Sequence, residues 1–181
     1  AADLMARTMR IDVTTTGLVT PAAAFGTMRA SVAGTLAQHA LTIAMKGEDL
    51  DLEASARGGF EMPPGSRDIE SLAWNGSLDA LENRGPWALR LTAPATVQLA
   101  RARARVGATR LAIADGNVRL AEFAWDDGKL ATSGSFTGVP LAAAARFAGV
   151  PLPFGSTLAL GGEWSLAAAP QLTGTVQVRR E

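Results

Sequence analysis

Few residues of this chain belong to the types that usually carry out chemistry. The 181 residues include no Cys and a single His, which excludes thiolate nucleophiles, thiolate metal sites and sites built from several histidines. The nearest carboxylates to His39 are Glu48 and Asp49, which lie beyond a predicted turn. A lone His is seldom a metal ligand or a catalytic group, so we expect His39 to be structural or solvated.

Two pairs of adjacent carboxylates, Glu48-Asp49 and Asp126-Asp127, fall in predicted turns. Asp is common in turns because its side chain bonds to the nearby backbone, and we expect these residues to be solvated. The sequence contains no Gly-x-Ser-x-Gly elbow, phosphate-binding loop or dinucleotide fingerprint. We therefore expect no enzymatic activity, no metal site and no cofactor.

Three arginines, Arg101, Arg103 and Arg105, alternate with small or apolar residues. In a strand, their guanidinium groups would line one face. Such a face is commonly a solvated surface or a charged edge that prevents aggregation. It can also attract phosphate, so these arginines are candidate residues for contact with a lipid headgroup or a membrane surface.

The elements that must position these residues are mostly β-strands. Apolar residues recur at every second position along about twelve segments, each bounded by Gly, Pro, Asp or Asn. Asp115-Gly116 predicts a two-residue hairpin loop that pairs Ile113 with Val118, because Asp and Gly tolerate positive φ. Loops at residues 46–49 and 38–39 predict two earlier hairpins, which would pair Met45 with Leu50 and Leu36 with Leu41. Together these turns favour an antiparallel meander.

A further hairpin is predicted at Asp127-Gly128, where Trp125 would pair with Leu130. Leu120 and Trp125 differ in parity, which predicts a β-bulge between them. One short helix is predicted near residues 140–148, since Pro suits a first helical position and Gly a stop.

The composition is typical of a folded domain with a large apolar surface. Hydrophobic residues make up 48% of the chain and charged residues 19%, which argues against disorder. The formal net charge is zero, which disfavours a general nucleic-acid binder. No segment has the length of a membrane span or the pattern of a signal peptide. We expect one β-rich segment over residues 1–181 that forms an internal piece of a longer protein.

One short helix cannot cover the apolar face of about twelve amphipathic strands. The sheet must therefore sandwich on itself, close into a barrel, or fold over and leave an apolar groove. A permanently exposed apolar face of this size indicates a ligand or partner. The alternating apolar residues are the candidate lining of such a groove: Leu41, Ile43, Met45, Leu50, Leu52, Trp74, Leu78, Trp87, Leu89, Leu91, Leu111, Ile113, Val118, Leu120, Leu158, Leu160, Trp164, Leu166, Leu172 and Val176.

Several short motifs resemble the TamB family, the inner-membrane-anchored subunits of the translocation and assembly module of Gram-negative bacteria. Residues 34–43 are similar to a Gly-small-Leu-x-x-His-x-Leu-x-Leu stretch of that family. The later blocks are Trp-Asn-Gly-Ser-Leu at 74–78, Trp-Ala-Leu at 87–89, Ala-Pro-Ala at 93–95, Gly-Ser-Phe at 134–136, Val-Pro-Leu at 139–141, Leu-x-Gly-x-Trp at 160–164 and residues 174–181.

The resemblance implies a fold and a location. TamB-like proteins, which are grouped with AsmA-like bridge-type lipid transfer proteins, carry a long periplasmic sheet folded into a β-taco with a hydrophobic groove. Their anchor lies in the inner membrane, and their carboxy-terminal end engages an outer-membrane barrel partner, TamA. Both regions would lie outside this chain, which would be a periplasmic middle piece.

Three functions remain open at this stage. The first is a groove segment that conducts phospholipid between the inner and outer membranes, with acyl chains as its ligand. The second is a chaperone-like scaffold for outer-membrane β-barrel protein assembly. The third is a closed β-sandwich binding module. Unpaired strand edges would also favour edge-to-edge self-association of the chain.

Overall fold

A computed structural model describes residues 5–19, 24–48, 50–63, 68–86, 88–147, 149–150 and 155–181. Its strands all belong to one 13-stranded antiparallel sheet, accompanied by a short α-helix and a 3-10 turn. The predicted all-β class, the meander and the short helix near residues 140–148 are confirmed.

The strands follow one another through the sheet in chain order. Between β5 and β10, two strand positions are each filled by two shorter strands: β6 continues into β7, and β8 into β9. The elements are β1 (Thr8–Val19), β2 (Ala24–Thr35), β3 (His39–Gly47), β4 (Asp51–Glu61), η1 (Ile69–Ser71), β5 (Ala73–Asn83), β6 (Leu89–Ala93), β7 (Ala95–Ala100), β8 (Arg103–Val106), β9 (Thr109–Ile113), β10 (Gly116–Asp126), β11 (Lys129–Pro140), α2 (Leu141–Phe147), β12 (Ala159–Ala168) and β13 (Leu172–Arg180).

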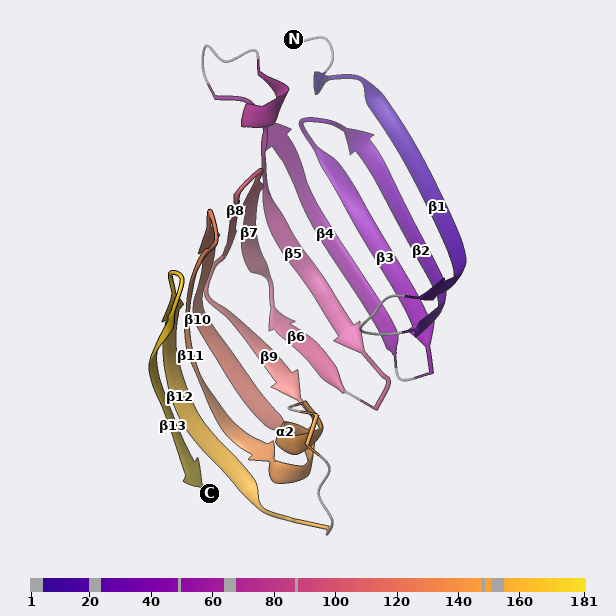
Figure 1. Cartoon of the computed structure of the whole chain (residues 1–181). Coiled ribbons are helices and arrows are strands. Elements are labelled where there is room, and N and C mark those ends of the chain that lie inside the picture. The colour runs from indigo at the N-terminus through magenta and orange to yellow at the C-terminus, as the bar shows by residue number, and fades with distance from the viewer. Residues whose placement is uncertain are drawn as a thin grey trace.

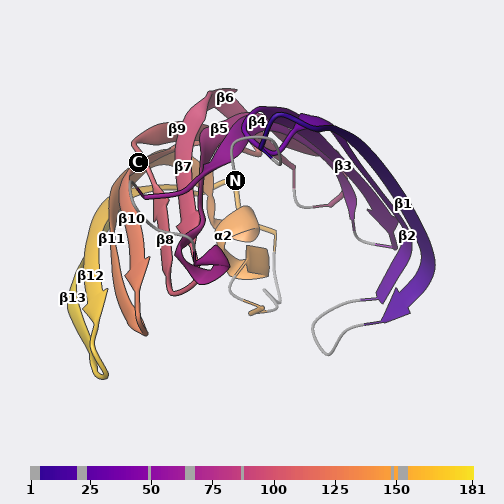
Figure 2. The ribbon, with the colours of Figure 1, turned by 90° about the horizontal axis from the view of Figure 1, so that it is seen from above.

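The sheet bends into an arch whose feet are the edge strands β1 and β13 (Figures 1 and 2). Figure 2 shows α2 inside this arch. Ile113 of β9 lines a small hollow together with Ala142 and Ala143 of α2. The side of the sheet that carries Ile113 is therefore its inner face, and the opposite side is its outer face.

Strand register assigns the other residues to these two faces, because side chains alternate along each strand. Ile113 pairs with Leu89 on one side and Gly116 on the other, and the register continues from strand to strand to both edges. Most large apolar residues of the strands fall on the inner face. Charged residues and most Thr and Ser residues alternate with them on the outer face, together with several alanines.

The chain buries little for its composition. Of the apolar residues described, only Ala56, Ala95, Val139 and Ala145 are buried, and no large side chain is fully enclosed. The accessible surface is 11818 Å², whereas a compact monomer of 18.7 kDa would expose about 8,300 Å². An open arch that leaves its apolar face uncovered accounts for the difference.

Glycine and aromatic residues are paired across neighbouring strands on the inner face. Gly134 lies opposite Trp164, and Phe136 lies opposite Gly162. A Cβ at Gly134 would lie 2.4 Å from the Trp164 ring, and one at Gly162 would lie 2.8 Å from the Phe136 ring. The recurring Gly-x-bulky motif therefore lets each ring lie over the glycine of the neighbouring strand.

One predicted hairpin has a different register. The loop after β9 is Ala114-Asp115, and Ile113 pairs with Gly116 instead of Val118. Ala114 itself takes the positive φ, of 48°. Gly116 is needed elsewhere, since a Cβ there would meet the Val139 backbone at 2.6 Å.

Two earlier hairpins also differ from their predicted registers. The loop at 46–49 was expected to pair Met45 with Leu50, but Met45 pairs with Leu52. Leu41, expected opposite Leu36, pairs with Val32. Each difference is an even number of residues, so the apolar side chains that lie within these strands keep their predicted face.

The hairpin at Asp127-Gly128 is confirmed, with Trp125 paired to Leu130 and positive φ at both loop residues. The predicted β-bulge is confirmed as well, and it lies between Leu120 and Glu122. This bulge returns Phe123 and Trp125 to the inner face.

Candidate functional site

The inner face is almost free of charge. Registers throughout the sheet place the Asp, Glu, Lys and Arg residues of the described strands on the outer face, with the exception of Arg180 at the end of β13. An uncharged concave surface that spans the whole sheet is a strong candidate for binding apolar ligands.

The structure brings most of the predicted lining together on this face. Trp87 lies outside the described residues, Leu50 lies in the loop between β3 and β4, and Leu158 precedes β12. The remaining predicted residues share the inner face: Leu41, Ile43, Met45, Leu52, Trp74, Leu78, Leu89, Leu91, Leu111, Ile113, Val118, Leu120, Leu160, Trp164, Leu166, Leu172 and Val176.

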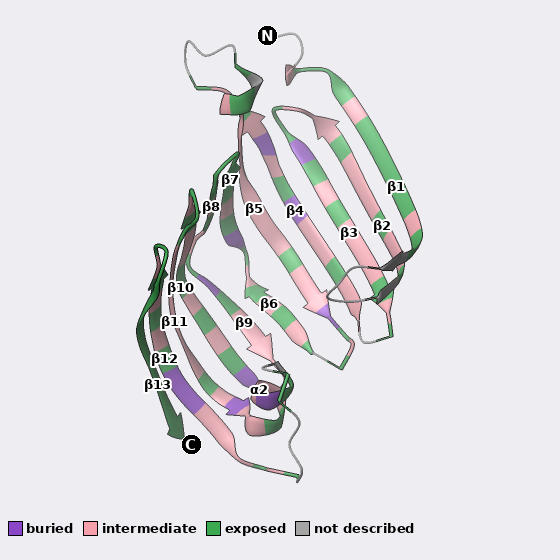
Figure 3. Cartoon of the chain, in the orientation of Figure 1, coloured by how far each residue is buried: buried purple, intermediate pink, exposed green. Residues whose placement is uncertain are grey.

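Many inner-face side chains remain open to solvent. Figure 3 shows the strands mostly intermediate or exposed, with few buried positions. The large apolar side chains of the inner face that are exposed by 37% to 67% are Ile11, Val13, Leu99, Trp125, Leu172, Val176 and Val178. They lie on the edge strands β1 and β13 and on β7 and β10 in the middle of the sheet. Nothing in the described chain covers them.

Several of these residues were missing from the predicted lining. Trp125 returns to the inner face only because of the bulge after Leu120, so simple alternation from the preceding strand misplaces it. Ile11 and Val13 alternate with polar residues in β1, and this period-two pattern was a sufficient signal. Phe123 was hidden by the same bulge as Trp125.

The only histidine is bound into the inner face. His39 is 8% exposed, and its Nε2 accepts a hydrogen bond of 2.9 Å from Trp74 Nε1. Because the indole N–H can only donate, the proton of the neutral imidazole must lie on Nδ1, which donates to the Thr35 carbonyl at 3.0 Å. Phe60 packs beside the imidazole with ring centroids 5.6 Å apart. These contacts give His39 a structural role, and the described residues contain no cluster of His, Asp and Glu that could hold a metal.

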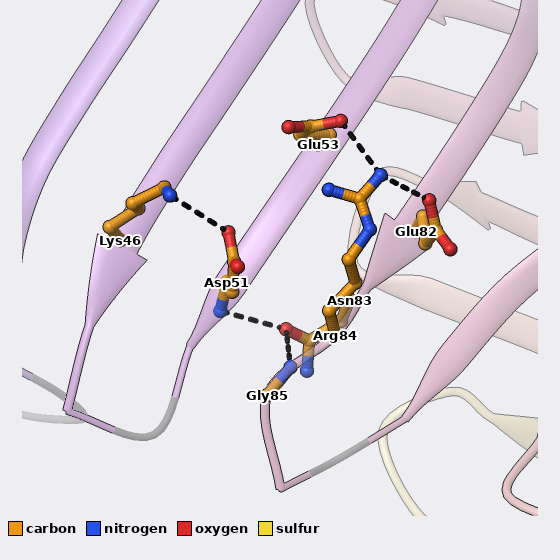
Figure 4. Close-up of polar contacts among 7 residues, drawn as sticks. All are labelled: Lys46, Asp51, Glu53, Glu82, Asn83, Arg84 and Gly85. Atoms are coloured by element: carbon orange, nitrogen blue, oxygen red, sulfur yellow. Dashed lines mark hydrogen bonds and ion pairs between the residues drawn. The ribbon is translucent and has the colours of Figure 1, made fainter.

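Charges at the lower ends of β3, β4 and β5 are paired with one another (Figure 4). Arg84 Nη2 donates to Glu82 at 2.7 Å and to Glu53 at 3.2 Å, and these bonds raise the pKa of Arg84. The buried Asn83 side chain accepts from the backbone N–H of Asp51 at 3.0 Å. This network joins the strand ends and keeps the charged groups at the outer surface.

A second outer-face pair lies farther along β4 and β5. Arg57 Nε donates to Asp79 at 2.6 Å. The hydrogen bond from Arg57 holds the pKa of Asp79 below its usual value, and the same bond raises the pKa of Arg57.

The three predicted headgroup arginines do not form one site. Arg101 lies in the turn before β8 and pairs with Glu70 of η1. Arg103 donates to Asp126 at 3.1 Å. Arg103 and Arg105 face the outer side of β8, away from the inner-face residues.

The chain has no match in comparisons with protein-family models, curated proteins and solved structures. Among the described helices, none has the length and apolar character required to cross a membrane.

Proposed function

We propose that the inner face is a groove for acyl chains, and that the chain is a lipid-conducting segment of a periplasm-spanning protein. The observation that carries this proposal is the uncharged inner face, which stays open to solvent along the arch. A soluble protein that leaves such a surface uncovered needs a ligand or partner to cover it.

The chemistry of the lining favours acyl chains over other apolar ligands. Leu, Ile, Val, Met and Ala dominate the inner face, and the rings of Trp74, Trp164 and Phe136 lie over glycines of neighbouring strands. Each acyl methylene that leaves water for such a surface contributes about 0.8 kcal/mol. Continuous apolar contact of this kind suits flexible chains of many lengths.

The backbone also suits a conduit. Most backbone hydrogen-bonding groups of the strands between β1 and β13 are paired within the sheet, so the groove floor presents mainly side chains. The passage of phospholipid between two membranes is supported by the resemblance to the TamB family. In that arrangement the polar headgroup would remain at the open side of the arch, in water.

Lipid retention tests the proposal. The protein is purified without detergent and analysed by native mass spectrometry, together with lipid extraction. We expect phospholipid at a defined stoichiometry, and its loss in the variant with Leu89→Asp and Leu160→Asp, which adds two charges to the inner face. The matched control with Thr173→Asp and Thr175→Asp adds two charges to the outer face and should retain lipid. A folded, monodisperse protein that holds no lipid and binds no added fatty acid would contradict the proposal.

A second candidate function is a scaffold for outer-membrane β-barrel proteins. It is favoured by β13, which is exposed at all nine positions and, among the described strands, pairs only with β12. An exposed edge of this length can accept an additional strand from another protein. Saturable binding of peptides with outer-membrane strand sequences, in protein that retains no lipid, would favour the scaffold over the lipid groove.

A further inference from the structure

The helix α2 is the α-helix that the described chain places on the inner face. It lies inside the arch, near the lower ends of β6 and β9 (Figures 1 and 2). A hollow of about 230 Å³ separates it from the sheet, and both Ile113 and Ala88 line this hollow. The helix therefore stands in the lower end of the groove and faces a residue of the proposed lining, Ile113, across this hollow.

The connection that contains α2 is long for a hairpin. Pro140 of β11 pairs directly with Ala159 of β12, so a two-residue loop would be enough to join them. The chain instead uses residues 141–158, whereas the adjacent hairpins are joined by residues 127–128 and 169–171. The sheet does not need this insertion to pair its strands.

Within the described residues, α2 makes few contacts with the rest of the protein. Its central residues are Ala142–Ala145, whose small side chains leave the hollow unfilled. A side-chain hydrogen bond joins it to the connection between β5 and β6, from Arg146 Nη1 to the Pro86 carbonyl at 3.0 Å. A seven-residue helix is not stable by itself, so its position depends on these contacts.

We infer that α2 is a displaceable stopper that closes the lower end of the groove to acyl chains. This inference rests on the proposed function. While α2 is docked, a bound chain ends at the helix, and longer chains gain nothing from their additional methylenes. When α2 leaves its place, the apolar surface around Ile113 becomes available and the groove is open at this end.

The registers suggest a direct test. In the deletion variant, Asn-Gly replaces residues 141–158 and joins Pro140 to Ala159 as a two-residue hairpin. Saturated fatty acids from C8 to C18 compete with a fluorescent fatty acid for the intact protein and the variant. In the intact protein, affinity should rise with length and then level off. In the variant, it should continue to rise beyond that length, by up to about fourfold per methylene.

A point variant tests the same inference without a deletion. Arg146→Ala removes the hydrogen bond to Pro86, and we expect the fluorescent fatty acid to enter several-fold faster in stopped-flow mixing. Arg10→Ala is the matched control, since it removes an exposed arginine from the outer face of β1, far along the sheet from α2. Its entry rate should equal that of the intact protein.

The possible outcomes distinguish failure of the stopper inference from failure of the proposed acyl-chain groove. Identical length dependence and entry rates in all forms, with binding retained, would overturn the stopper. Loss of binding in a deletion variant that still unfolds cooperatively would also overturn it, because α2 would then be part of the binding surface. Absence of binding in the intact protein would instead contradict the proposed function. If the deletion variant does not fold, the comparison of Arg146→Ala with Arg10→Ala decides.

Discussion

At the scale of single residues, His39 and Trp74 show how polar groups are accommodated on an apolar face. The Trp74 N–H donates a hydrogen bond to Nε2 of His39, and Nδ1 of His39 donates one to the Thr35 carbonyl. The sequence left His39 as either structural or solvated, because no second ligand stood near it, and the structure shows it buried. Sequence reasoning could not identify Trp74 as the partner, since the two residues are brought together only by the pairing of β3, β4 and β5.

Replacing His39 with Phe tests this contact. The substitution leaves the Trp74 N–H without its acceptor, so we expect the free energy of unfolding to fall by about 1–3 kcal/mol in urea denaturation. In a protein that already carries Trp74→Phe, His39→Phe should lower the free energy of unfolding by clearly less. If the losses of the two single variants simply add in the double variant, the two side chains are not coupled.

The ion pair of Arg57 and Asp79 makes a prediction about pH. Arg57 lowers the pKa of Asp79, so the ionised form of this carboxyl group is more stable in the folded state than in the unfolded state. The resulting contribution to stability is present above the ordinary Asp pKa and is lost as the pH falls through the lowered value. NMR titration should show the pKa of Asp79 rising toward its usual value in Arg57→Gln. An unchanged titration curve in that variant would refute the assignment.

At the scale of elements, period-two patterning was enough to predict which residues share a face, but not which residues pair. Leu41 and Met45 lie on their predicted face although their partners differ from those predicted. The face is determined by burial, whereas the register depends on turns such as Ala114-Asp115, where an alanine takes positive φ. Gly116, read as a turn residue, is required by the close backbone of Val139.

The glycines beneath aromatic rings give a prediction at this scale. Gly134→Ala would place a Cβ against both the Trp164 ring and the Arg119 carbonyl, each at 2.4 Å. We expect the unfolding free energy to fall by about 1–3 kcal/mol as the ring is displaced. Gly155→Ala is the control, because a Cβ there meets nothing within 4 Å. Equal stability of the two variants would argue against the packing of Trp164 over β11.

At the scale of the whole molecule, the arch reflects an excess of apolar strand surface over the elements that could cover it. A chain that is 48% hydrophobic forms one sheet, and the described part contains no second sheet to cover it. The surplus of apolar strand face could be predicted from the sequence. The arch was one of three arrangements that the strand pattern left open, and the pattern could not choose among them, because curvature depends on bulges and glycine contacts that appear only when the strands are paired.

The open shape predicts unusual denaturation behaviour. The slope of unfolding free energy against urea concentration scales with the surface exposed on unfolding. Because the folded chain already exposes 11818 Å², this slope should be smaller than for a compact protein of the same length. A slope typical of compact 181-residue proteins, in lipid-free monomer, would mean that the arch closes in solution.

The most direct test of the acyl-chain groove compares two neighbouring positions of β3. Ile43 lies on the inner face and Thr42 on the outer face, so Ile43→Asp and Thr42→Asp add the same charge on opposite sides of one strand. Titration with a fluorescent fatty acid, on variants shown to be folded, measures the consequence. The account predicts affinity at least tenfold weaker in Ile43→Asp and unchanged affinity in Thr42→Asp. Equal affinities in the two variants, or weaker binding only in Thr42→Asp, would contradict it.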